Sequence, residues 1–185
     1  MPSTDADQHR VSAHPIPEDI KAVTGPSEAL GLRNLADMVE SAARRYARQK
    51  AFTAVVPNGM NGSLTFAQVD QLADAFAAYL REELKVPEGT RVAVQLPNGL
   101  AYPVAAFGIF KAGCVLVNTN PLYTAAEMEH QFRDSGAQVL VITELFADKL
   151  DGLMERTSLR HVVVASVPEL FPAIPRGIVR AVQTP

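Results

Sequence analysis

The stretch "RVAVQLPNGLAYPVAAFGIFKAGCVLVNTNPLYTAAEMEHQFRDSGAQVLVI", residues 91–142, decides the fold of this chain. It contains short apolar runs separated by segments of helical length, and the same alternation continues to residue 165. The expected strands are 91–96, 114–117, 139–142 and 161–165. Strands alternating with helices in this way are joined by right-handed crossovers and form a parallel sheet covered on both faces. The sequence therefore predicts an α/β fold with a mostly parallel sheet and helices on both faces.

The helix expected over 99–110 is apolar around almost its whole circumference, which is typical of a helix buried on several sides. Asn98 is the expected N-cap, and Gly113 fits the left-handed residue that follows a helix. Pro103 conflicts with a start at residue 99, because proline is well tolerated only in the first turn. The helix therefore begins one or two residues later or is kinked at Pro103.

Two further helices begin with the spacing of a capping box, in which Ser or Thr is followed three residues later by Glu or Gln. Thr65 and Gln68 form the first pair, and Thr124 and Glu127 form the second. The second helix is expected to end at Gly136. One more amphipathic helix is expected over 144–156.

The segment before the sheet predicts a helix and a β-hairpin. The helix is expected to begin at Asn34. The first hairpin strand is expected over 52–56, and residues 64–66 begin its partner strand. Asn58-Gly59 and Asn61-Gly62 are the expected polar turn between these strands.

The chain divides into three parts by its pattern of residues. Residues 1–30 are proline-broken and are expected to be an irregular lead-in, and 31–167 carry the α/β pattern. Residues 168–185 are a proline-rich tail in which no element is expected. The only cysteine, Cys114, lies among apolar residues in the expected strand 114–117 and is interpreted as a small core side chain.

Composition excludes several classes of protein. With 48% hydrophobic and 20% charged residues among 185, the chain has the composition of a soluble globular domain. A net charge of −3 argues against a nucleic-acid binder, and a single cysteine allows no intrachain disulfide, which fits the reducing cytoplasm. The N-terminus lacks the apolar core of a secretory signal, and the longest apolar stretch is shorter than the roughly 20 residues of a membrane span.

No common catalytic or phosphate-binding motif is present. No G-x-G-x-x-G follows a strand. Residues 108–113 have the glycine spacing of a Walker loop, but Cys114 and Val115 stand where Lys and Ser or Thr are required. His130 lies among charged residues of one helix, which is typical of a solvated face rather than a metal or catalytic site.

The 118–124 loop is the one candidate site, formed by Asn118, Asn120, Pro121, Tyr123 and Thr124. Ligands of open parallel sheets bind beyond the carboxyl ends of strands, where this loop lies. The same residues would equally make a well-built turn followed by a helix cap. A structural corner and a contact with substrate both stay open.

Residues 64–80, "LTFAQVDQLADAFAAYL", and residues 91–142 resemble the N-terminal part of AMP-forming acyl-CoA synthetases. The resemblance extends over about 32–165 and is strongest to bacterial long-chain fatty-acid–CoA ligases of the acyl-adenylate-forming superfamily. Its motifs occur in the family's order: Leu64-Thr65-Phe66, Lys111-Ala112-Gly113, Asn120-Pro121-Leu122-Tyr123-Thr124 and Asp134-Ser135-Gly136-Ala137.

The resemblance implies a ligase that joins a fatty acid to coenzyme A through an acyl-adenylate, with ATP, Mg²⁺ and CoA. In that family the phosphate loop, the nucleotide contacts and the catalytic lysine lie downstream of the matched region. The chain is therefore expected to be a truncated N-terminal subdomain with no catalytic, cofactor-binding or metal residue and no turnover alone. Its expected partner is the remainder of the ligase chain, while a homodimer and peripheral contact with the inner face of the membrane stay open.

Two alternatives belong to other functional classes. The chain could be a free-standing α/β module that binds a protein partner without catalysis. The segment 171–180 could instead meet a lipid surface through its apolar and basic residues, although its prolines disfavour this. A fragment that has lost its packing partner is expected to self-associate, to bind a hydrophobic dye, or to have a disordered tail after about residue 167.

Overall fold

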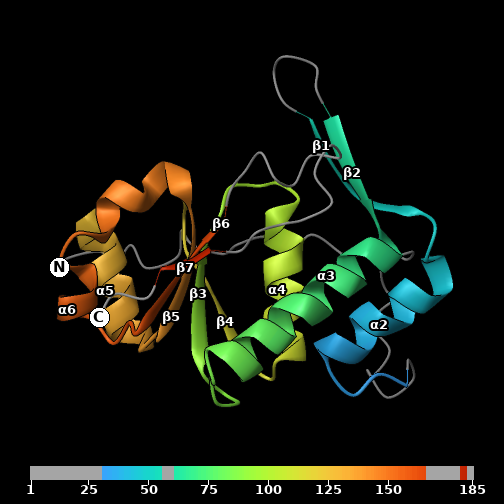
Figure 1. Ribbon diagram of the computed structural model, residues 1–185, viewed down its shortest axis with the longest axis horizontal. Helices are drawn as coiled ribbons and strands as arrows, with labels where there is room; N and C mark the ends of the chain where they lie inside the picture. The colour runs from blue at the N-terminus through green and yellow to red at the C-terminus, as the bar shows by residue number, and fades with distance from the viewer. Residues whose placement is uncertain (1–30, 56–60, 166–179, 183–185) are drawn as a thin grey trace, which may run out of the picture. The chain divides into compact units, whose positions relative to one another are not determined.

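The computed structural model describes residues 31–55, 61–165 and 180–182 (Figure 1). The chain separates into two units, Met1–Arg33 and Asn34–Pro185, and every helix and strand below belongs to the second. Within it, a five-stranded sheet has the order β4-β3-β5-β6-β7. The strands are β3 (Arg91–Gln95), β4 (Val115–Asn118), β5 (Val139–Thr143), β6 (His161–Ala165) and β7 (Arg180–Val182).

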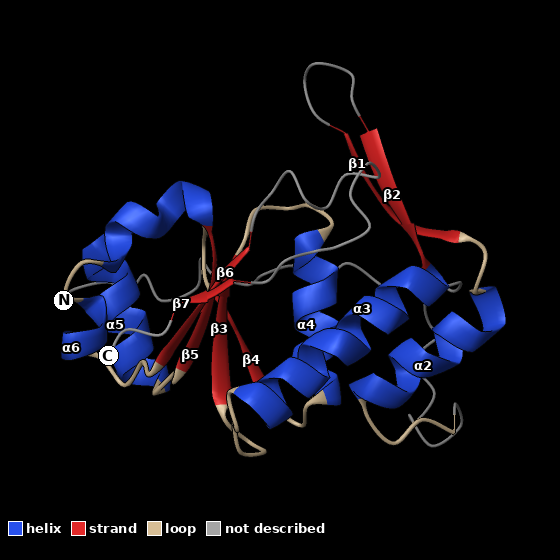
Figure 2. Cartoon of the chain, in the orientation of Figure 1, coloured by secondary structure: helices blue, strands red, loops and turns tan. Residues whose placement is uncertain are grey.

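The strands β3, β4, β5 and β6 run parallel, as the sequence predicts. Helices cover both faces: α3 (Phe66–Ala78) and α4 (Ala101–Lys111) on one, α5 (Ala125–Ser135) and α6 (Leu153–Arg156) on the other (Figure 2). Successive strand residues alternate between the two cores. Residues 92, 94, 139, 141 and 163 pack on the α3–α4 face, and residues 93, 140, 142 and 162 pack on the α5–α6 face.

The α3–α4 contact is close because Gly108 has no side chain. A Cβ at this position would lie 2.7 Å from Cδ1 of Phe76 and 3.0 Å from the carbonyl oxygen of Ala73. At the C-terminal end of α4, Nζ of Lys111 donates to Asp70 and Asp74 of α3, at 2.6 Å in each case. The apolar helix expected over 99–110 is thus packed between α3 and the sheet.

The start of α4 corrects the expected cap. The residue before the helix is Leu100, which makes no capping hydrogen bond through its side chain, and the first helical residue is Ala101. The prediction that Asn98 is the N-cap is therefore wrong. With this later start, Pro103 lies in the first turn, where a missing N–H removes no hydrogen bond within the helix. Gly113 has φ +73°, as expected of the residue after this helix.

The N-terminal elements follow the predicted order. The helix α2 (Leu35–Tyr46) has Asn34 as its N-cap, with the side chain accepting from the backbone N–H of Asp37. The strands β1 (Lys50–Val55) and β2 (Asn61–Thr65) form the predicted antiparallel hairpin. Asn61 and Gly62 are strand residues rather than part of the turn, and Asn58-Gly59 lies outside the described residues.

Both predicted capping boxes form. Thr65 and Gln68 exchange side-chain hydrogen bonds with each other's backbone at the start of α3, and Thr124 and Glu127 do the same at α5. The helix α3 continues as one π-helical segment, η2 (Tyr79–Glu83). The helix α5 ends at Gly136 with φ +64°, again as predicted.

The prediction of a single helix over 144–156 is wrong. The structure has a 3₁₀ segment, η3 (Glu144–Leu150), followed by the short helix α6. Between them Asp151 has ψ 121° and Gly152 has φ +61°, so the backbone leaves the helical region. The apolar spacing in this segment buries Leu153 but leaves Leu145 65% exposed.

The strand expected over 114–117 was predicted to be buried, and the structure differs. Its structural counterpart, β4, is the outermost parallel strand, and Val115 is 48% exposed. Cys114 precedes β4 and is buried in the α3–α4 core, in agreement with its interpretation as a core residue. An apolar run indicates a strand but does not say whether both of its edges are paired.

The expectation that 168–185 carry no element is corrected by β7. This strand pairs antiparallel with β6, with Val163 opposite Ala181. The prolines at 168, 172, 175 and 185 lie outside the described residues. None of the described helices has the length and apolar character needed to span a lipid bilayer.

Candidate functional site

The 118–124 loop leaves the carboxyl end of β4 and lies against the end of β3. The backbone N–H of Thr119 donates to the carbonyl of Val94 at 3.0 Å, which completes the last pair of the parallel ladder, Val94 with Asn118. The loop is therefore at the edge of the sheet where ligands of α/β proteins usually bind.

The two asparagines hold the turn together. The side chain of Asn120 accepts from the N–H of Leu122 at 3.0 Å, and its carbonyl accepts from the N–H of Tyr123 at 3.0 Å. The Asn118 side chain accepts from the hydroxyl of Tyr102, in the first turn of α4, at 2.7 Å. Asn118 and Asn120 are thus already used in hydrogen bonds within the protein.

Neutral amides bind the carbonyl groups of the loop. Nε2 of Gln95, at the end of β3, donates to the carbonyls of Asn120 and Pro121 at 3.2 and 3.4 Å. Nε2 of Gln131, on α5, donates to the carbonyl of Asn118 at 2.8 Å. These contacts tie one loop to a strand and a helix.

Lys149 of η3 also binds the loop. Its Nζ donates to the carbonyls of Tyr123 at 2.7 Å and Pro121 at 3.4 Å. The same ammonium lies 4.5 Å from the ring centroid of Phe146. The positive charge of Lys149 is therefore stabilised by carbonyl dipoles and an aromatic face at the carboxyl edge of the sheet.

Thr124 connects the loop to α5. Its N–H donates to Oε2 of Glu127 at 2.8 Å, and its Oγ1 accepts from the N–H of Glu127 at 3.4 Å. The pKa of the Glu127 carboxyl is lowered, first by the backbone hydrogen bond from Thr124 and then by the threonine hydroxyl. The ionised carboxylate is therefore the form that caps the helix.

The structure thus brings together the five predicted residues and gives them partners inside the protein. Asn118, Asn120 and Thr124 are hydrogen-bonded through their side chains, and Tyr123 packs against the α5–α6 core. These contacts are those of a structural corner. At the tip of the loop, Leu122 is 80% exposed. A contact of this loop with substrate stays a prediction.

The supporting residues Gln95, Gln131, Lys149 and Tyr102 were not singled out from the sequence. Gln95 carries a weak signal, because it is a polar residue at the end of an apolar strand. The others carry none, because their partners are between 13 and 28 residues away in the chain.

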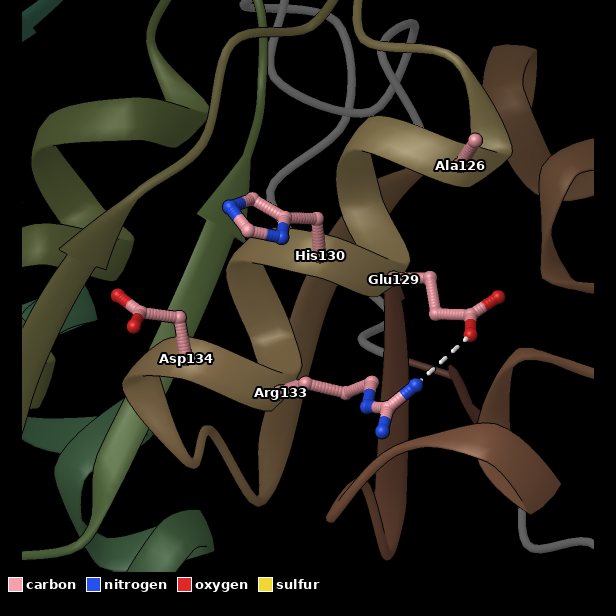
Figure 3. Close-up of a pocket in the computed structure, with 5 residues that line it drawn as sticks. All are labelled: Ala126, Glu129, His130, Arg133 and Asp134. Atoms are coloured by element: carbon pink, nitrogen blue, oxygen red, sulfur yellow. Dashed lines mark ion pairs between the residues drawn. The ribbon is translucent and has the colours of Figure 1, made fainter.

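Two residues considered as catalytic candidates have ordinary structural environments. Burial raises the pKa of the Cys114 thiol, with a further contribution from Glu88, so the nucleophilic thiolate is disfavoured. His130 lies on the outer face of α5 beside a shallow hollow, together with Glu129, Arg133 and Asp134 (Figure 3).

Glu129 and Arg133 of this hollow are engaged in ion pairs on the helix surface. Glu129 accepts from Arg156 at 2.8 Å and lies 3.6 Å from Arg133. In the close-up, His130 and Asp134 extend away from this pair (Figure 3). Within the described ranges no group of three or more His, Cys, Asp or Glu residues is placed to hold a metal ion.

The chain is similar to known proteins in both sequence and fold. Residues 39–176 match the family described as AMP-binding enzyme. The long-chain-fatty-acid–CoA ligase of Salmonella typhimurium is 43% identical over 148 residues, which are 80% of this chain and 25% of that protein. The salicyl-AMP ligase/salicyl-S-ArCP synthetase of Mycobacterium tuberculosis is 32% identical and covers 92% of this chain.

Among solved structures, the apo structure of MbtA from Mycobacterium smegmatis superposes with a TM-score of 0.65 and 29% identity. The superposition covers 92% of this chain and 33% of that one. The chain spans about a quarter of the length of the curated long-chain ligases that it matches. The family match covers most of the α/β region, and the chain therefore belongs to the AMP-binding enzyme family.

Proposed function

We propose that this chain is the N-terminal portion of a long-chain fatty-acid–CoA ligase. The observation that carries the proposal is the 43% identity over 148 residues with the Salmonella enzyme of that name. The complete protein would take a fatty acid, ATP with Mg²⁺, and coenzyme A. A fatty-acid carboxylate attacks the α-phosphorus of ATP to give acyl-adenylate and pyrophosphate, and the CoA thiol then displaces AMP.

In this proposal the chain supplies scaffold rather than catalytic groups. The described residues place no phosphate-cradling loop at the carboxyl edge of the sheet. Instead, the loop there is held by Gln95, Gln131 and Lys149. ATP, Mg²⁺ and CoA are bound chiefly by the remainder of the ligase. The 185-residue chain alone is inactive.

A chimaera tests the proposal. Residues 39–176 replace the aligned segment of the Salmonella ligase, and the formation of acyl-CoA and pyrophosphate from palmitate, ATP and CoA is measured. Substantial retention of the parent activity is expected, while the 185-residue chain alone releases no pyrophosphate. Turnover by the chain alone would refute the scaffold role. The same chimaera carrying Phe132→Ala, which disrupts the α5–α6 core, is the control for a folded insert.

The acid substrate has a second candidate. The relative named salicyl-AMP ligase matches a larger share of this chain, at 32% identity over 184 residues. An aryl acid is therefore the alternative to a fatty acid. The longer natural reading frame that contains these residues, expressed whole, would decide between them. We expect pyrophosphate release with palmitate and not with salicylate, and the reverse would assign the aryl acid.

We further propose a cytoplasmic location with peripheral contact at the inner face of the membrane. The acyl chain of a long-chain substrate is stored in lipid, which motivates the contact. Sedimentation with anionic and neutral vesicles tests it. Two other proposals remain for the chain itself. It could be a partner-binding module without catalysis, and it could form a homodimer. Light scattering of the chain over a dilution series distinguishes a monomer from a dimer.

A further inference from the structure

Thr119 and Gln95 are neighbours on the same face of the sheet. The parallel ladder pairs Val117 with Ala93 and ends with Asn118 beside Val94, a pair that includes the hydrogen bond from Thr119 N–H to the Val94 carbonyl. Extending this register by one residue sets Thr119 beside Gln95. Because side chains alternate along a strand, both lie on the face of Val117 and Ala93, which is the α5–α6 face.

The orientation of the Gln95 amide follows from its partners. Its NH₂ group donates to two carbonyls of the loop, and a flipped amide would place its oxygen against both carbonyl oxygens. Oε1 must therefore face away from these carbonyls. Gln95 is 0% exposed, and its Oε1 has no hydrogen-bond partner among the described residues.

Thr119 presents a second buried polar atom without a partner. The residue is 5% exposed, and its Oγ1 makes no hydrogen bond with any residue that the structure describes. Two adjacent side chains at the end of β3 and β4 thus each bury one polar atom whose desolvation is not compensated. Such atoms in folded proteins are usually satisfied by an internal water, which needs two to four polar partners.

We propose that Gln95 Oε1 and Thr119 Oγ1 bind one buried water molecule, which ties the 118–124 loop to the end of β3. The water donates one hydrogen to the amide oxygen, which can only accept, and exchanges a second hydrogen bond with the threonine hydroxyl. With Gln95 Nε2 already on the loop carbonyls, the glutamine then links strand, water and loop. This inference does not depend on the proposed ligase function.

The direct test is a crystal structure of the 185-residue chain at a resolution that shows ordered waters. The expected result is one water within hydrogen-bond distance of both Gln95 Oε1 and Thr119 Oγ1. A direct hydrogen bond between the two side chains, or an apolar group in contact with both, would overturn the proposal.

Thr119→Val gives an independent test in solution. If the hydroxyl binds water, its loss leaves Gln95 short of a partner, so the thermal midpoint falls by about 2–4 °C and the amides of Leu122 and Tyr123 exchange faster. If the hydroxyl is unpaired, the near-isosteric valine leaves loop exchange unchanged and raises the midpoint. That outcome would contradict the water.

Thr143→Val is the matched control. Thr143 is 0% exposed, and its hydroxyl also has no partner in the described part of the chain. Alternation along β5 places it on the α3–α4 face, opposite to Gln95. Exchange in the 118–124 loop should therefore be unchanged in this variant. Thr119→Ser, which keeps the hydroxyl, should retain slow loop exchange, and faster exchange there would implicate the methyl group rather than the water.

Discussion

Different chemistry fixes the two faces of the sheet. On the α3–α4 face, the Lys111 ammonium bridges two carboxylates, each at 2.6 Å, and its side chain is 5% exposed. On the α5–α6 face, the neutral amides of Gln95 and Gln131 hold the loop before α5 by donating to backbone carbonyls. The contact between α3 and α4 is thus an ion pair, whereas these two contacts with the loop are between neutral groups.

The difference has consequences for pH. Burial opposes the charge of Lys111, but the hydrogen bonds to Asp70 and Asp74 outweigh it and raise the pKa of the ammonium. The amides of Gln95 and Gln131 do not titrate. We therefore expect alkaline conditions to weaken the α3–α4 contact while the amide contacts of Gln95 and Gln131 with the loop are unchanged.

The largest effect is expected from the cores themselves. Phe132 is 0% exposed on the α5–α6 face, and Phe132→Ala should lower the free energy of unfolding by about 3–5 kcal/mol. Ile109→Ala on the α3–α4 face should cost about 2–5 kcal/mol. Urea denaturation measures both. Leu145→Ala, at a 65% exposed position, is the control and should change stability little. Equal costs for Leu145 and Phe132 would show that the assignment of the core is wrong.

Close helix packing should give the next effect. Gly108→Ala places a methyl group 2.7 Å from Cδ1 of Phe76 and 3.0 Å from a backbone carbonyl. The resulting shift of α3 against α4 should cost about 1–3 kcal/mol, despite the better helix propensity of alanine. Gly99→Ala is a matched control, since the nearest atom to its added Cβ is 3.8 Å away. A Gly108→Ala variant as stable as Gly99→Ala would contradict the close approach.

Removal of the charged contact tests the comparison directly. Lys111→Met leaves two facing carboxylates, but Asp70 and Asp74 are 27% and 62% exposed and can be hydrated. We therefore expect a loss of about 1–2 kcal/mol, below the range for a fully buried pair.

The pH dependence of this loss has a definite sign. Because the folded-state pKa of Lys111 is above its ordinary value of 10.5, its contribution is complete below that pH. It disappears as the pH rises through the folded-state pKa. The stability difference between wild type and Lys111→Met, measured by urea denaturation from pH 7 to 11.5, should therefore shrink at the alkaline end. A constant difference would indicate packing rather than charge.

The smallest loss of stability is expected on removal of the threonine of either capping box. Thr65→Ala and Thr124→Ala should each cost about 1 kcal/mol at neutral pH. The partner of Thr65 is the neutral Gln68, whereas the partner of Thr124 is Glu127, whose carboxyl pKa is lowered from 4.5. The contribution of Glu127 is present above pH 4.5 and is lost as the pH falls through its folded-state pKa. Lowering the pH should therefore reduce the stability cost of Thr124→Ala but not that of Thr65→Ala. Urea denaturation at pH 7 and pH 3 measures both costs.

Local signals in the sequence predicted most elements correctly. Asn34, Thr65 and Thr124 cap helices through contacts that span three residues, and Gly113 and Gly136 end helices through their own backbone conformation. The alternation of apolar runs and amphipathic segments was enough for the parallel sheet, because each crossover must bury one apolar face.

The wrong predictions have two kinds of cause, namely a local change of the backbone and pairing with a distant segment. Asn98 was a good cap by residue type, but α4 begins at Ala101. The segment 144–156 had helical spacing, but its backbone breaks at Gly152 and Lys149 binds the 118–124 loop instead. β7 had no distinctive pattern of its own and exists through pairing with β6.

The sequence by itself determined the α/β class, the parallel strands, the two capping boxes and the family, because hydrophobic period, turn residues and short-range hydrogen bonds are all local. Only the tertiary structure decided that β4 is an outer strand and that Gln95, Gln131 and Lys149 hold the candidate loop. Hydrogen bonds to backbone carbonyls require no particular residue on the acceptor side. Such contacts therefore leave no paired signal in the sequence, and the side chains that hold the loop became visible only in three dimensions.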